Sequence, residues 1–281
     1  MASERWRTGF QTGKFRQFYR DWQPQAAKGL PVLALHGSLT QSGMWNALAE
    51  AAQTVRLLSP DQRGFGLSED PGSDPCAEFA ADALALARSM LPARYVVMGH
   101  SFACSIALDV ALRAPAQVVA VVLVDPVVRL GPPPTPSTPP PRPPESFATT
   151  DEAMRHYRDT EEGEWTDETL RRFVEDIMLS DGQGRRRFPY TSERLRRLRS
   201  FTASAVSDFD LFGKTKAVGR PVLVFRGGQS KRFPEAAEQP FLDSFASKPV
   251  LVRCPRSGHF PSATDTGIVV AALKRFLDDL G

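Results

Sequence analysis

The sequence contains few of the residues from which metal centres and disulfide frameworks are built. Among its 281 residues are three cysteines and four histidines, and Cys76, Cys104 and Cys254 lie far apart. Neither a CxxC nor an HExxH pattern occurs, so we expect no metal site. An odd number of scattered cysteines is typical of reduced thiols, which favours a cytoplasmic protein over a secreted, disulfide-bonded one.

Strong net charge, long apolar runs and a glycine-rich phosphate loop are also missing. The formal net charge is +3, which is too small to indicate a nucleic-acid partner. No stretch approaches the length of a membrane-spanning helix, and residues 1–29 lack the apolar core of a secretory signal. Without a phosphate loop we expect no dinucleotide cofactor. These absences favour a protein that acts on a small molecule away from membranes, and they leave its oligomeric state open.

The sequence does contain a serine between a predicted strand and a predicted helix. Residues 93–98 are typical of a short buried strand, and residues 104–112 form an alanine-rich run without a helix breaker. The segment between them reads G-H-S-F-A. A serine at such a sharp turn projects its hydroxyl clear of the backbone, and small residues on either side let strand and helix approach closely. The pattern therefore predicts Ser101 as a nucleophile, with Gly99 and Ala103 as the small neighbours.

This segment resembles the nucleophile elbow of α/β-hydrolases in its G-x-S-x-A form. The resemblance extends to residues 30–38, an apolar strand that ends in a His-Gly turn, and to residues 61–68, which resemble the D-x-R-G-x-G-x-S loop of the superfamily. It covers nearly the whole chain. It implies a mostly parallel, eight-stranded sheet with helices on both faces and a helical lid inserted after strand six. No cofactor is implied.

The resemblance also implies roles for the residues around Ser101. The backbone amides of Ser38 and Phe102 would form an oxyanion hole, which stabilises negative charge on a substrate oxygen. Three residues of the same two turns, His36, Gly37 and His100, are candidates for lining the substrate site.

His259 is the predicted general base. It follows the last predicted strand, residues 249–253, where catalytic histidines of the family lie. The other histidines belong to the two turns already described or, as His156, to the predicted insertion.

The acid that should orient this histidine is missing from its usual place. After the predicted strand 221–225 the chain carries Lys231 where relatives have aspartate, and a lysine would repel an imidazolium. Asp125 ends the strand 119–124, twenty-four residues beyond Ser101, at an alternative position that several hydrolase subfamilies use. We favour Asp125. The remaining carboxylates considered are Glu235 as the main rival, followed by Asp208, Asp210 and Asp265.

A compositional change marks an insertion after Arg129. Residues 131–144 hold nine of the 24 prolines and read as a semi-rigid linker. Helices are predicted over 151–157, 167–179 and 191–201. We therefore expect a core of residues 1–130 and 214–281, with a linker and helical lid at 131–213.

The predicted lid supplies candidate substrate contacts. Trp165 and Tyr190 are candidates for lining the pocket. Arg129, or one of the seven arginines between residues 185 and 199, could pair with a substrate carboxylate, because guanidinium binds carboxylate through two hydrogen bonds. The arginine cluster could equally be a solvated helix face.

Together these features predict a serine hydrolase that cleaves an ester, lactone or amide of a small organic substrate through an acyl-enzyme. Cleavage of a carbon–carbon bond flanked by ketones uses the same residues. A different reaction class is also open. Residues 258–265 together with Asp125 resemble cofactor-free ring-cleaving dioxygenases of this fold, in which a His–Asp pair is the base and the serine only binds substrate.

Overall fold

A computed structural model describes residues 6–38, 40–72, 76–130, 146–203 and 211–281, without the side chains of residues 6 and 198–203. Within these ranges eight strands form one sheet in the order β1-β2-β4-β3-β5-β6-β10-β11. The hairpin of β1 and β2 joins the rest antiparallel through β4, and all other neighbours are parallel. The strands are β1 (Trp6–Thr12), β2 (Arg16–Trp22), β3 (Val32–Leu35), β4 (Leu57–Pro60), β5 (Tyr95–His100), β6 (Val118–Val124), β10 (Val222–Gly227) and β11 (Val250–Cys254).

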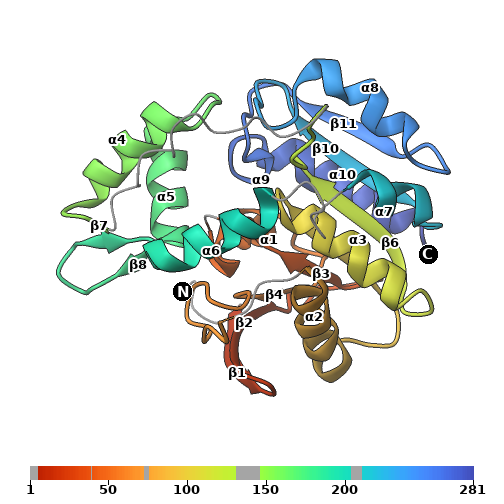
Figure 1. The fold of residues 1–281 in the computed structure, drawn as a ribbon, viewed down its shortest axis with the longest axis horizontal. Coiled ribbons are helices and arrows are strands. Elements are labelled where there is room, and N and C mark those ends of the chain that lie inside the picture. The colour runs from red at the N-terminus through yellow and green to blue at the C-terminus, as the bar shows by residue number, and fades with distance from the viewer. Residues whose placement is uncertain (1–5, 39, 73–75, 131–145, 204–210) are drawn as a thin grey trace.

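Both faces of the central strands are buried, which explains their continuous apolar runs. Successive side chains of a strand point to opposite faces, so β6 contributes Val121 and Leu123 to one core cluster and Val122 and Val124 to the other. Helices cover each face (Figure 1). The first cluster is covered by α2 (Cys76–Met90), α3 (Ala103–Arg113), α7 (Phe212–Ala217) and α8 (Glu235–Asp243), and the second by α1 (Asn46–Ala51) and α10 (Thr266–Asp278).

The segment between β6 and α7 lies beside one end of the sheet (Figure 1). It contains α4 (Thr150–Thr160), α5 (Asp167–Ile177), α6 (Ser192–Ala203) and a small sheet of β7 (Ser146–Phe147), β9 (Arg186–Arg187) and β8 (Leu179–Ser180). Thr166 caps α5 by accepting a hydrogen bond from the Thr169 amide. We call this part of the chain the inserted segment.

Helix α5 docks closely on the core. The carbonyl of Asp176 lies where a side chain on Gly43 would be, so the 3-10 helix η1 (Ser42–Trp45) meets α5 through a glycine. Asn46 donates a hydrogen bond of 2.7 Å to the Asp176 carboxylate. The inserted segment is thus fixed to the core next to the turn that follows β3, and its action as a lid stays a prediction.

The α/β-hydrolase architecture with a mostly parallel eight-stranded sheet is confirmed. The predicted helices of the insertion appear as α4, α5 and α6, while residues 131–144 fall almost entirely outside the described ranges. In the described part of the chain, none of the helices has the length and apolarity needed to cross a membrane.

Because β6 is buried on both faces, trimming one of its side chains should destabilise the whole domain. Leu123 has 0% exposure, and Leu123→Ala should lower the free energy of unfolding by about 3 kcal/mol through lost burial and a cavity. Leu67→Ala, at a side chain that is 46% exposed, is the matched control and should change it by less than about 0.5 kcal/mol. Urea unfolding of both variants tests this, and equal losses would contradict it.

Candidate active site

Ser101 lies at a sharp turn between β5 and α3. Its φ of 58° is in the left-handed region, which a non-glycine residue rarely adopts, and its amide donates to the Val124 carbonyl on β6. A side chain on Gly99 would collide with the carbonyl of Ala103, so only glycine lets strand and helix meet here. The predicted elbow geometry is therefore present.

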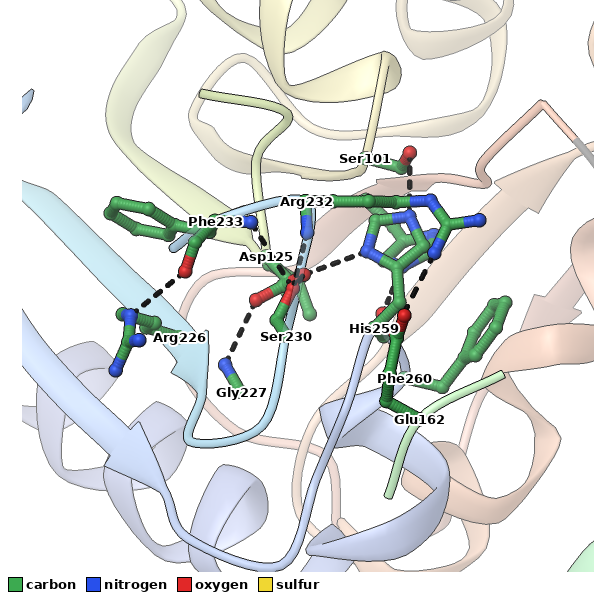
Figure 2. A network of polar contacts seen from close by, with 12 residues as sticks. Ser101, Asp125, Glu162, Arg226, Gly227, Ser230, Arg232, Phe233, His259 and Phe260 are labelled. Carbon is green, nitrogen blue, oxygen red and sulfur yellow. Dashed lines mark hydrogen bonds and ion pairs between the residues drawn. The ribbon is translucent and has the colours of Figure 1, made fainter. Parts of the chain in front are cut away.

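Three predicted catalytic side chains meet at this turn (Figure 2). The Nε2 atom of His259 lies 2.9 Å from Ser101 Oγ, and its Nδ1 atom lies 2.7 Å from Asp125 Oδ2. A carboxylate accepts the proton on Nδ1, which leaves Nε2 with a lone pair that accepts the serine hydroxyl. This is the arrangement in which an imidazole can remove the proton of Ser101.

The rival acids do not share this position. Glu235 is an exposed residue at the start of α8, and Asp265 accepts hydrogen bonds from Ser257 and Arg256 instead. Lys231, at the usual acid position, is 82% exposed and pairs with Glu162 at 3.5 Å. Two further candidates, Asp208 and Asp210, lie outside the described residues.

Asp125 is held by donors that sequence reasoning missed. The Gly227 amide donates to Oδ1 at 2.8 Å, and the Ser230 hydroxyl donates to Oδ2 at 2.6 Å (Figure 2). The backbone of Asp125 is itself left-handed, with a φ of 43°. The signal available in the sequence was the segment R-G-G-Q-S at residues 226–230, which spans the end of β10. Its serine contacts the acid.

Burial shifts the ionisation of the Asp125–His259 pair. It raises the pKa of Asp125 to about 6, although the hydrogen bonds from Ser230 and Gly227 oppose the shift. Burial, together with the positive charge of Arg232, holds the pKa of His259 well below its usual value. Above pH 6 the pair is therefore a carboxylate beside a neutral imidazole, which is the form that a general base needs.

The turn after β3 lies against the nucleophile. A side chain added at Gly37 would collide with the His100 ring and press on Ser101 Cβ, so the turn reaches the elbow through a glycine. Ser38 follows in this turn and is half-buried, while Phe102 is the residue that precedes α3. The two predicted oxyanion donors thus belong to two turns in contact.

The two histidines of these turns form hydrogen bonds with backbone groups. His36 has 0% exposure, its Nε2 accepts from the Gln62 amide and its Nδ1 donates to the Gly37 carbonyl. His100 is buried and donates through Nε2 to the His259 carbonyl at 2.7 Å. Burial lowers the pKa of His36 to about 4. Both ring nitrogens of His36 are occupied, and we assign it to fixing the turn instead of binding substrate.

The two aromatic residues predicted to line the pocket are separated from the site by other aromatic rings. Trp165 is half-buried and lies 6.2 Å from Phe260, the neighbour of His259. Tyr190 is also half-buried and lies 6.0 Å from Phe65, whose ring is 6.4 Å from that of Phe102. Their predicted contact with substrate stays a prediction.

The arginines proposed for substrate binding are mostly engaged elsewhere. Arg186 pairs with Glu175, Arg194 donates to a backbone carbonyl at 2.7 Å and Arg197 pairs with Asp70. Arg129 is exposed. A cation that the sequence did not single out lies nearer the base: Arg232 pairs with Glu161 at 3.1 Å and lowers the pKa of His259.

Comparison with known proteins agrees with this fold. The model of a family described as the Alpha/beta hydrolase family matches residues 32–272. Lipase LipV from Mycobacterium tuberculosis (strain ATCC 25618 / H37Rv) is 37% identical over 101 residues, which cover 35% of this chain and 38% of the lipase. A 2-hydroxymuconate semialdehyde hydrolase from Pseudomonas putida is 32% identical over 111 residues, covering 38% of this chain and 40% of that protein. The chain spans at most two fifths of these relatives.

Solved structures share the fold over nearly the full length. The thioesterase domain from the curacin biosynthetic pathway has a TM-score of 0.73 at 18% identity and covers 96% of this chain and 99% of its own. An E-2-(acetamidomethylene)succinate hydrolase has a TM-score of 0.73 at 19% identity and covers 97% and 99%. At these identities the likeness shows the fold alone.

The contacts of Asp125 generate a prediction for pH dependence. In the wild type, kcat/KM for an activated ester should fall below about pH 6, because a proton enters the Asp125–His259 pair. Ser230→Ala removes a hydrogen bond to the carboxylate, so it should move this acid limb upward by roughly one pH unit and lower kcat/KM near neutrality about tenfold.

The control for this prediction is Ser244→Ala. The Ser244 hydroxyl contacts Thr215 and the Phe241 carbonyl instead of the site, so its profile should match the wild type. If both variants show the wild-type acid limb, Ser230 does not support the acid.

Proposed function

Because the chain belongs to the alpha/beta hydrolase family, we propose that it is a serine hydrolase that opens ester, lactone or amide bonds through an acyl-enzyme. The observation that carries the proposal is one continuous hydrogen-bonded chain. It runs from Ser101 Oγ through His259 to Asp125 in contacts of 2.9 and 2.7 Å. Serine at its ordinary pKa is a poor nucleophile, and such a chain is what activates it.

In the first half of the reaction, His259 Nε2 takes the proton of Ser101 as Oγ attacks the substrate carbonyl carbon. The negative oxygen that results would be stabilised by the amides of Ser38 and Phe102. Asp125 stabilises the imidazolium formed at this stage. The imidazolium then passes its proton to the leaving alcohol or amine, and an acyl group remains on Ser101.

In the second half, water replaces the leaving group. His259 removes a proton from the water, which attacks the acyl carbon, and the returning proton restores the Ser101 hydroxyl. The low pKa of His259 favours this cycle, because the imidazole is neutral and ready to accept a proton before each attack. The same two steps apply to esters, lactones and amides.

A second candidate is hydrolysis of a carbon–carbon bond next to a ketone. It is favoured by the similarity to 2-hydroxymuconate semialdehyde hydrolase, which covers 40% of that protein. A panel of nitrophenyl esters, lactones and diketones, each assayed with Ser101→Ala in parallel, separates the two activities. Oxygen uptake with a hydroxylated heteroaromatic compound, retained in Ser101→Ala, would instead indicate the dioxygenase reaction.

Two finer features belong to the proposal. A carboxylated substrate is supported by Arg129, an exposed residue four positions beyond Asp125 in the chain. A reducing, cytoplasmic setting is supported by the state of the three cysteines, which are buried free thiols.

The nucleophile is tested with a fluorophosphonate probe. The probe should label the wild-type protein at Ser101, since only an activated serine reacts, and Ser101→Ala should lose labelling together with at least about 10³-fold of kcat. Ser105→Ala, on the next turn of α3, is the matched control and should keep the label. Turnover within tenfold of the wild type in Ser101→Ala would contradict the serine mechanism.

The acid is tested by comparing two carboxylates. Asp125→Asn should lower kcat by about 10²–10⁴-fold, because an amide neither holds the imidazole tautomer nor stabilises its charge. Glu235→Gln should leave kcat within twofold, since Glu235 is exposed on α8. A larger loss of kcat in Glu235→Gln than in Asp125→Asn would instead identify Glu235, in the helix that follows β10, as the acid.

A further inference from the structure

Away from Ser101, a lysine amine lies against a buried cysteine thiol. The Nζ atom of Lys214 on α7 is 3.2 Å from Sγ of Cys76, the first residue of α2. The same Nζ is 2.8 Å from Oγ of Ser105 on α3. Cys76 is 1% exposed, whereas Lys214 is only half-buried. Three helices from distant parts of the chain therefore converge on one thiol–amine contact.

The other cysteines have different surroundings. The Cys104 thiol contacts the carbonyl oxygens of Gly99 and Val124, and Cys254 ends β11 in the core. Burial raises the pKa of all three thiols, but at Cys76 the charge and hydrogen bond of Lys214 oppose that shift. A cation beside sulfur favours the reactive thiolate, so Cys76 is the thiol best placed for chemistry.

We propose that Cys76 and Lys214 form a covalent crosslink when the protein meets hydrogen peroxide. The sulfur attacks the peroxide, its O–O bond breaks, and sulfenic acid and one water result. The neutral amine then attacks the sulfur; an S–N bond forms and the hydroxyl leaves with an amine proton as a second water. Sulfur is oxidised and peroxide is reduced. Excess thiol returns both side chains to their starting state.

The geometry favours this step over reaction with a second protein molecule. The amine is already at hydrogen-bond distance from the sulfur, and a second hydrogen bond that it donates to Ser105 holds it there. Cys76 is 1% exposed and Lys214 is half-buried, so the sulfur is closed to a second protein molecule while its own neighbour, the lysine amine, is within reach.

The crosslink would have a structural consequence. Helix α7 is the element through which the inserted segment rejoins the core, and α3 carries Ser101 at its start. Joining residues 76 and 214 closes a long loop in the unfolded chain, which should raise the thermal unfolding midpoint. The inference is independent of the hydrolase mechanism.

The experiment is peptide mapping of the full-length protein after peroxide treatment. Digestion without reductant should yield a linked pair of peptides containing Cys76 and Lys214, two hydrogens lighter than their sum, and dithiothreitol should abolish it. A linked pair whose mass exceeds that value by one oxygen, formed by reaction with a second peroxide molecule, joins the same two residues and also supports the proposal. The oxidised protein should unfold several degrees higher, reversibly with dithiothreitol.

Two variants serve as controls. Lys214→Arg keeps the positive charge but supplies a guanidinium that stays protonated, so the linked pair and the added stability should both disappear. Cys76→Ser should do the same. Wild-type peptides in which Cys76 is unmodified or carries sulfinic acid, with no linked pair to Lys214, would overturn the proposal. So would a linked pair that persists in Lys214→Arg.

Discussion

The hydrogen bond between Asp125 and His259 is the interaction on which the rest of the site depends. A buried carboxylate is costly unless donors surround it, and here two donors besides the imidazole come from the last residue of β10 and from the loop that follows it. Those donors exist because β6 and β10 are neighbours in the sheet, so the loop after one reaches the tip of the other. The parallel order of the strands therefore fixes the acid, the acid fixes the imidazole, and the imidazole faces the serine.

Much of this arrangement could be predicted because local chemistry requires it. The elbow needs Gly99 for close approach of strand and helix, and a five-residue pattern carries that requirement. The lysine at residue 231 excluded the usual acid, which left Asp125 as the carboxylate at the tip of the neighbouring strand. The core strands were readable because strands buried on both faces are continuously apolar.

What the sequence did not reveal depends on contacts between distant segments. Ser230 supports Asp125 across more than a hundred residues, and only the pairing of β6 with β10 brings them together. The hairpin of β1 and β2 carries charged and aromatic residues at the sheet edge, which gave no apolar run to identify it. The arginines after residue 185 looked like substrate ligands, but Arg194 is buried against the loop after β4.

A covalent intermediate at Ser101 is the central step of the proposed reaction, and mass spectrometry of the protein during turnover of an activated ester tests it most directly. Rapid acid quenching should trap one acyl group, and peptide mapping should assign it to Ser101. The adduct should decay in step with release of the acid product. Turnover of the ester with Ser101 unmodified throughout, or with the acyl group on another residue, would contradict an acyl-enzyme at Ser101.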